Sequence, residues 1–127
     1  MIRIKSFLLI HLSFFAATNL LAASVYEFNK TIQTFGNNEF INAVYEDTLV
    51  DIARKYNLGF NEIIRANPNV DKWLPGEGTI IKIPAQHIIP KGFSEKGITI
   101  NLSEFRGYFI KDNKLITFPV GLGRMDW

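Results

Sequence analysis

The sequence predicts an α+β protein in which a short β-α-α-β module precedes an all-β segment. Between residues 40 and 84 the apolar spacing changes from a strand pattern to two helical patterns and back to a strand. From residue 97 onward, apolar and polar residues alternate in three short runs separated by turn residues. This period of two is typical of β-strands.

The first half of the module is predicted from residues 40–56. Residues 40–44 alternate as a strand, and a polar corner follows in which Asp47 or Thr48 can cap a helix. The helix has one apolar stripe at helical spacing. This stripe comprises Leu49, Ile52, Ala53 and Tyr56.

The second half contains another short helix and a closing strand. Residues 57–59 stop the first helix, Asn61 is expected to cap the second, and Pro68 ends it. Residues 79–84 are predicted as the strand. Helices this short need packing on strands to be stable. The predicted core comprises Phe40, Val44, Leu49, Ile52, Ala53, Ile63, Ile64, Ile81 and Ile83.

The all-β segment covers residues 97–127, with a hairpin turn at 111–114. Alternation places Arg106 and Tyr108 on one face of the middle strand. Gly107 is expected to weaken that strand, and Pro119 to mark an edge or a strand end. Three strands without a further partner leave edges unpaired, so this unit is expected to be incomplete.

The remaining segments are predicted from composition. Residues 1–23 combine a basic start with an apolar run and small residues, which indicates a signal peptide; an uncleaved anchor is the alternative. The protein is therefore expected to be exported to the periplasm or cell envelope, without stable membrane insertion after cleavage. Residues 24–39 are predicted as a linker or lead-in strand, and residues 85–96 as a connector.

Charge and residue types exclude several functions. All 12 acidic residues and all but two of the 14 basic residues follow the predicted signal, so no basic face for nucleic acid is expected. The chain has no cysteine, and therefore no thiolate ligand or cysteine nucleophile. His87 alone does not make a metal site. Neither a metal nor a cofactor is predicted.

Residues 40–84 resemble a LysM domain, through "EDTLVDIARKYNLGFNEIIRANPNV", "LPGEGT" and "IKIP". The resemblance implies binding to N-acetylglucosamine-containing glycans of peptidoglycan in a shallow groove. Two loops would form this groove: the one before the first helix and the one joining the second helix to the last strand. The implied glycan-binding residues are Asp47, Thr48, Leu49, Asn67, Pro68, Asn69, Leu74, Pro75 and Gly76.

Structural roles are the alternatives at these positions. Asp47 and Thr48 can serve only as helix caps, and Asn67 can satisfy backbone groups of its loop. Trp73 is expected to pack at the edge of the module, with stacking on a sugar as the alternative.

A wider stretch resembles the start of YkuD-type L,D-transpeptidases, through "NVDKWLPGEGTIIKIPAQHIIP", "GITINLSEFRGYFI" and "FPVGLGRMDW". In that family a LysM module precedes a β-sandwich catalytic domain with a His and a Ser-X-Gly-Cys motif. The resemblance implies that residues 97–127 are the truncated first strands of this β-sandwich-like domain. No catalytic residue is therefore expected in this chain.

Three hypotheses follow from the sequence. The first is non-covalent binding of peptidoglycan by a truncated protein that lacks the catalytic cysteine. The second is a fragment of an active L,D-transpeptidase that cross-links stem peptides. The third is a non-functional remnant whose unpaired strands favour aggregation.

Overall fold

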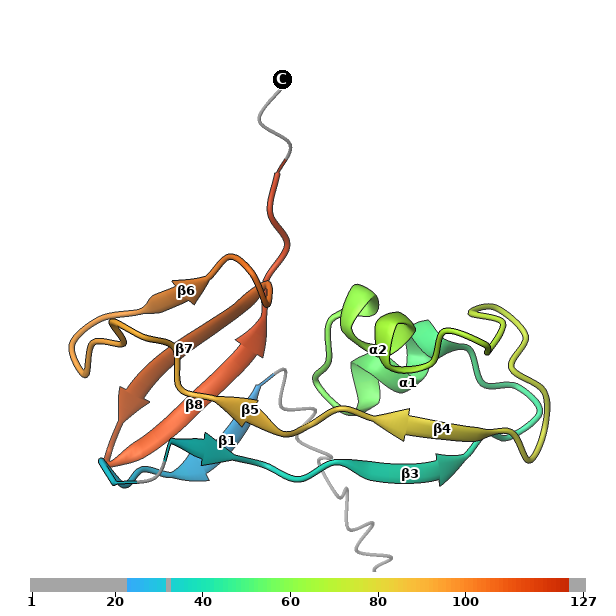
Figure 1. The fold of residues 1–127 in the computed structure, drawn as a ribbon, viewed down its shortest axis with the longest axis horizontal. Helices are drawn as coiled ribbons and strands as arrows, with labels where there is room; N and C mark the ends of the chain where they lie inside the picture. Colours follow the sequence, from blue (N-terminus) through green and yellow to red (C-terminus); the bar gives the residue numbers. More distant parts are fainter. Residues whose placement is uncertain (1–22, 32, 124–127) are drawn as a thin grey trace, which may run out of the picture.

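The computed structural model describes residues 23–31 and 33–123, which form two units side by side (Figure 1). The helical unit consists of β3 (Glu39–Asn42), α1 (Leu49–Lys55), α2 (Phe60–Ala66) and β4 (Ile80–Ile83). The sheet unit consists of β1 (Ser24–Glu27), β2 (Thr34–Phe35), β5 (His87–Ile88), β6 (Thr99–Asn101), β7 (Arg106–Lys111) and β8 (Lys114–Pro119). In the described ranges no helix has the length and apolar character needed to cross a membrane. Apart from Ala23, the predicted signal peptide lies outside them.

The helical unit confirms the predicted order of strand, helix, helix and strand. β3 pairs antiparallel with β4, with Ile41 opposite Ile81, and both helices lie over one side of this pair (Figure 1). The strands and helices share one core. Its buried members are Ala43, Leu49, Ile52, Ala53, Leu58, Ile63, Ile81 and Ile83.

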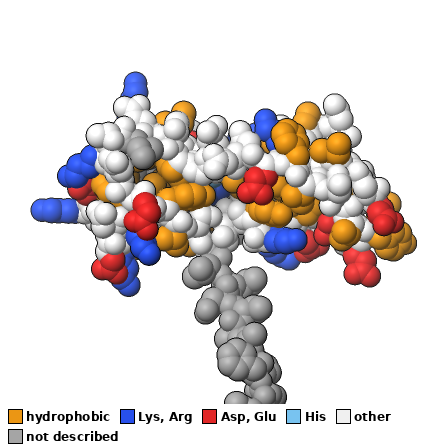
Figure 2. Space-filling model, turned by 90° about the horizontal axis from the view of Figure 1, so that it is seen from below, with side chains coloured by type: hydrophobic (Ala, Val, Ile, Leu, Met, Phe, Trp, Pro, Cys, Tyr) orange, Lys and Arg blue, Asp and Glu red, His pale blue; other side chains and the backbone are white. Residues whose placement is uncertain are grey.

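The prediction that Phe40 and Val44 belong to the core is wrong. Phe40 is 69% exposed and Val44 is 59% exposed. Phe40 lies opposite Lys82, on the face of the β3–β4 pair turned away from Ile41 and Ile81, so it points away from the core. Figure 2, which views the molecule from below, shows apolar side chains at the surface among charged ones. Ala43 and Leu58 contribute to the core instead.

The two helices begin differently from each other. Thr48 caps α1 as predicted, with its Oγ1 accepting the Asp51 N–H at 3.1 Å, and Asn57 follows this helix with a left-handed φ of 54°. The prediction that Asn61 caps α2 is wrong, because the N-cap is Gly59. The Gly59 N–H donates to the Glu62 carboxylate at 2.9 Å, so a carboxylate from within the first turn closes this end of the helix.

The sheet unit contains four hydrogen-bonded strands in the order β1-β8-β7-β6. The expectation of three strands is corrected by β1, which pairs antiparallel with β8, Val25 opposite Ile116. β1 lies within residues 24–39, which were predicted as a linker or lead-in strand, and it corresponds to the second alternative. The predicted connector also contains a strand, because β5 pairs with β2 and places Phe35 opposite His87. Residues 24–31 and 33–35 are therefore part of the sheet unit.

Two local features of the β7–β8 hairpin explain its geometry. Asp112 and Asn113 both have positive φ, 51° and 60°, which matches the twist of a two-residue hairpin turn and confirms the predicted turn. A Cβ at Gly107 would lie 2.6 Å from Cζ of Phe118. The aromatic ring covers the glycine, so Gly107 is required by close packing rather than being a weak point of the strand.

The predicted alternation in β7 is confirmed by its buried face. Tyr108 is fully buried and Arg106 is 1% exposed. The Phe35 ring lies 6.1 Å from Tyr108 and 5.0 Å from Tyr26, centroid to centroid. The short β2–β5 pair thus packs on this face of the four-stranded sheet.

The buried Arg106 side chain joins the two units. Its Nη2 donates to the Glu62 carboxylate at 2.7 Å and to the Asn57 carbonyl at 3.1 Å, both in the helical unit. Its Nη1 lies 3.4 Å from Oγ1 of Thr117 on β8. One carboxylate, Glu62, therefore both caps α2 and neutralises a buried guanidinium on the sheet.

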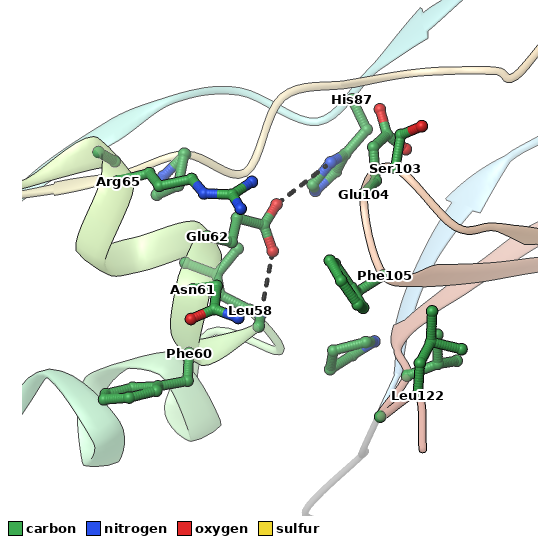
Figure 3. Close-up of a pocket in the computed structure, with 16 residues that line it drawn as sticks. Leu58, Phe60, Asn61, Glu62, Arg65, His87, Ser103, Glu104, Phe105 and Leu122 are labelled. Atoms are coloured by element: carbon green, nitrogen blue, oxygen red, sulfur yellow. Dashed lines mark hydrogen bonds and ion pairs between the residues drawn. The ribbon is translucent and has the colours of Figure 1, made fainter. Parts of the chain in front are cut away.

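His87 completes this junction. It is 7% exposed, and its Nδ1 lies 3.6 Å from the Glu62 carboxylate (Figure 3). Burial, assisted by the nearby Arg106 charge, lowers the pKa of His87 to about 4. His87 is neutral at pH 7, so its contact with Glu62 is a polar contact and not an ion pair.

We expect Glu62→Gln to lower the free energy of unfolding by about 2–4 kcal/mol, because the Arg106 charge stays buried without its carboxylate. The exposed Glu77→Gln is the matched control, with an expected change within about 0.5 kcal/mol. Urea denaturation followed by circular dichroism measures both. Equal stabilities of the two variants would show that the ion pair contributes nothing.

We expect the wild-type chain to lose up to about 3 kcal/mol of stability as the pH falls from about 6.5 to about 4 through His87 alone. In this window the unfolded chain takes up a proton at His87 and the folded chain does not, so acid favours unfolding. His87→Gln should flatten the curve of unfolding free energy against pH in that range. Parallel curves for the two proteins would contradict the assignment.

Candidate functional site

The two loops predicted to form the glycan groove lie next to each other. The Leu49 N–H, at the start of α1, donates to the Lys72 carbonyl at 3.0 Å. The Ala43 N–H donates to the Thr79 carbonyl, and the Gly78 N–H donates to the Ala43 carbonyl, both at 2.8 Å. The segment before α1 is thus held against the segment between α2 and β4.

In the first loop, the side chains are engaged within the loop itself. The Asp47 carboxylate accepts the Val44 N–H at 2.8 Å, and Thr48 caps α1. Both residues are half-buried, whereas the Leu49 side chain is fully buried in the core. The side chains of Asp47 and Thr48 can therefore contact a ligand in part. Leu49 can contact a ligand only through its backbone atoms.

In the second loop, Asn67 points inward and its neighbours point outward. Asn67 Nδ2 donates to the carbonyls of Ile63 and Lys82, and its Oδ1 accepts the Lys82 N–H, all at 2.8–2.9 Å. This side chain ties the end of α2 to β4 and is 6% exposed. Pro68 and Asn69 are exposed.

The distal part of this loop has a preset shape. The Asp71 carboxylate accepts the N–H groups of Trp73 and Leu74, both at 2.8 Å, and these hydrogen bonds lower the pKa of Asp71. The Pro75 carbonyl accepts the Thr79 hydroxyl at 2.7 Å. Gly76 has a φ of 86°, which favours glycine. Leu74, held on this turn, is 74% exposed.

Trp73 packs on a neighbouring aromatic, in agreement with the structural role predicted for it. Its ring lies 6.1 Å from that of Phe60, and Lys72 Nζ lies 5.6 Å from its centroid. It is nevertheless 58% exposed, so part of the ring faces solvent.

A separate cleft of about 820 Å³ lies between α2 and the sheet unit (Figure 3). α2 contributes Glu62 and Arg65, β5 contributes His87, and the turn between β6 and β7 contributes Glu104 and Phe105. The sequence did not identify this cleft. The one signal available was Arg106, a charged residue at an inward position of a strand, which must have a carboxylate partner in another element.

Glu104 holds a buried tyrosine at the rim of this cleft. The Tyr108 hydroxyl donates to the Glu104 carboxylate, and burial together with this hydrogen bond raises the pKa of Tyr108 far above its usual value. Glu104 is exposed, and through this hydrogen bond it anchors the β6–β7 turn to the sheet.

The model of the LysM domain family matches residues 44–84. The chain is also similar to the probable L,D-transpeptidases YcfS and YbiS of Escherichia coli (strain K12). YcfS is 38% identical and YbiS is 37% identical, each over 94 residues, which are 71% of this chain. The matched region covers 29% of YcfS and 30% of YbiS. The probable L,D-transpeptidase ErfK/SrfK of Salmonella typhimurium is 35% identical over 78 residues, 60% of this chain and 25% of that protein.

These matches have two consequences. The chain spans less than a third of the length of the curated relatives it matches. The similarity to YcfS and YbiS, 94 residues long, also extends well beyond the region matched by the family model. Residues 44–84 are a LysM domain, and the chain that carries it is similar to a part of the L,D-transpeptidases.

Proposed function

We propose that this chain binds the glycan strands of peptidoglycan non-covalently, in the cell envelope, after export directed by residues 1–23. The LysM domain implies peptidoglycan binding. The observation that carries the proposal is the hydrogen bond between Leu49 and Lys72, because it holds the two loops together as one surface.

The chemistry of the two loops suits a sugar chain. A glycan offers hydroxyl and amide groups together with apolar faces, so it needs both hydrogen-bonding groups and flat apolar contacts. We assign the hydrogen bonds to Asp47, Thr48 and Asn69, and to backbone groups near Leu49 and Gly76. The apolar contacts come from Pro68, Leu74 and Pro75, while Asn67 fixes the second loop from below.

The binding is expected to be weak. The LysM resemblance implies a shallow groove, and the side chains of Asp47, Thr48 and Asn67 are already hydrogen-bonded within the domain, so few new buried contacts form with the glycan. The association cost removes most of the gain from those contacts. We expect dissociation constants of about 10–1000 µM for short oligosaccharides.

We expect Leu74→Ser to weaken chitotetraose binding about fivefold, because it removes an apolar contact of about 1 kcal/mol. Ile98→Ser is the matched control, since Ile98 is 65% exposed and belongs to the sheet side of the molecule. Chemical-shift titration of the 127-residue chain measures both. Wild-type shifts away from the two loops, or no retention on purified peptidoglycan above a control protein, would refute the proposal.

The similarity to probable L,D-transpeptidases favours a second candidate function, peptidoglycan cross-linking by a longer protein that includes these residues. The 127 residues contain no cysteine, so they cannot supply a cysteine nucleophile. We therefore expect no cross-linking activity from this chain alone, measured with muropeptide substrates. An open reading frame that continues past codon 127 with a His and a Ser-X-Gly-Cys motif would establish the second function for the gene.

A further inference from the structure

We propose that this chain forms a twofold dimer through the outer face of its four-stranded sheet. The outer face is the side of β1, β8, β7 and β6 turned away from the buried Arg106 and Tyr108. In this proposal it packs against the same face of a second copy. The inference is independent of glycan binding, because the groove loops belong to the helical unit and not to this sheet.

The strand register places large apolar side chains on the outer face of every strand. Val25 on β1 lies opposite Ile116 on β8, and Ile116 lies opposite Phe109 on β7. In the next row on this face, Phe118 on β8 and Ile100 on β6 lie on either side of the glycine of β7. Because alternate residues of a strand point to the same side, these two rows share one face. Together they extend across all four strands.

These side chains are open to solvent, whereas those on the other face of the same strands are buried. Ile100 is 51% exposed and Val25 is 44% exposed. Ile98 and Leu102, two residues before and after Ile100, are 65% and 64% exposed and extend the apolar surface. An antiparallel sheet with one solvated face ordinarily carries polar side chains on that face. The apolar outer face therefore indicates a second layer that the described residues do not supply.

Two aromatic rings form the centre of the outer face. The centroids of Phe109 and Phe118 are 6.2 Å apart, with their planes at 66° to each other. Both rings are half-buried by their neighbours, and the aliphatic side chains around them are more exposed. Interfaces between subunits commonly have this composition, with aromatic groups near the centre.

The area of the outer face is large for a monomer and sufficient for a dimer. The exposed parts of its apolar side chains amount to roughly 500 Å², near the upper end of the largest patches on monomeric proteins. Two copies packed face to face would bury roughly 1,000 Å² from these side chains alone, which is the lower limit for a specific interface. The neighbouring lysine stems would add to this area. A reversible dimer is expected for an interface of this size.

The charges on the outer face agree with a twofold arrangement. Glu27, Lys114 and Lys111 form one row at the end of the sheet near the β7–β8 turn, and the two apolar rows carry no charge. If the strands of both copies ran in the same direction, the lysines of the two copies would meet and repel each other. A twofold axis that reverses the strand direction places the charged rows at opposite ends, where they stay in water. Aligned sheets pack face to face in this way in β-sandwiches.

The test is sedimentation of the 127-residue chain at concentrations from about 1 µM to about 200 µM. We expect a monomer–dimer equilibrium with a dissociation constant of about 10 µM, in keeping with a small interface. Ile100→Glu should raise this constant at least tenfold, because it brings two carboxylates into an apolar interface. Ile80→Glu is the matched control, since Ile80 is 65% exposed on β4 of the helical unit. Its dissociation constant should stay within twofold of the wild-type value.

Folding and the location of the interface are checked separately. A thermal melt of each variant shows whether it is folded, and Val25→Lys, at the opposite edge of the sheet, is a second variant expected to weaken the dimer at least tenfold. Amide chemical shifts of the wild-type chain are compared at low and high concentration. We expect them to change along β1, β6, β7 and β8 and to stay constant in the groove loops.

Several results would overturn the proposal. A monomer at every concentration would show that a second copy does not cover the outer face. Association that folded Ile100→Glu and Val25→Lys variants leave unchanged would belong to another part of the chain. Open-ended association without a dimer would indicate pairing along the sheet edges instead. Concentration-dependent shifts confined to residues 39–83 would move the interface to the helical unit.

Discussion

The arrangement of this protein depends on a guanidinium group that is removed from water. Arg106 is 1% exposed, and a charge in that position is tolerated only with a close carboxylate. The carboxylate comes from Glu62 in the other unit, where it also accepts the Gly59 N–H. The start of α2 and the position of the sheet are therefore coupled through one side chain, and the cleft between them takes its shape from this contact.

Local chemistry accounts for what the sequence predicted correctly. The Thr48 cap, the left-handed Asn57 and the Asp112-Asn113 turn each depend on neighbours a few residues away. The pairing of β1 with β8 joins residues about ninety positions apart, and no pattern in residues 24–27 specifies that partner. Phe40 was assigned to the core for the same reason, because only the register with Lys82 decides which face of the strand is covered.

At the candidate site, too, features set by neighbouring residues could be predicted from the sequence, and features set by residues far along the chain could not. The family resemblance named two loops for the groove, and the structure shows that these loops lie next to each other. The sequence did not predict the directions of their side chains. Asn67 is directed inward by carbonyl groups of both α2 and β4, the second of them 15 residues further along the chain. Arg65 and Glu104 resemble ordinary surface charges in the sequence. Their placement across one cleft is visible only once Arg106 has brought the two units together.

The short helix α2 is held at both ends, and this affects how its two surfaces can act. Glu62 fixes its first turn to the sheet unit, and Asn67 fixes its last turn to β4. The separation between groove and cleft is therefore set by buried contacts rather than by a flexible linker.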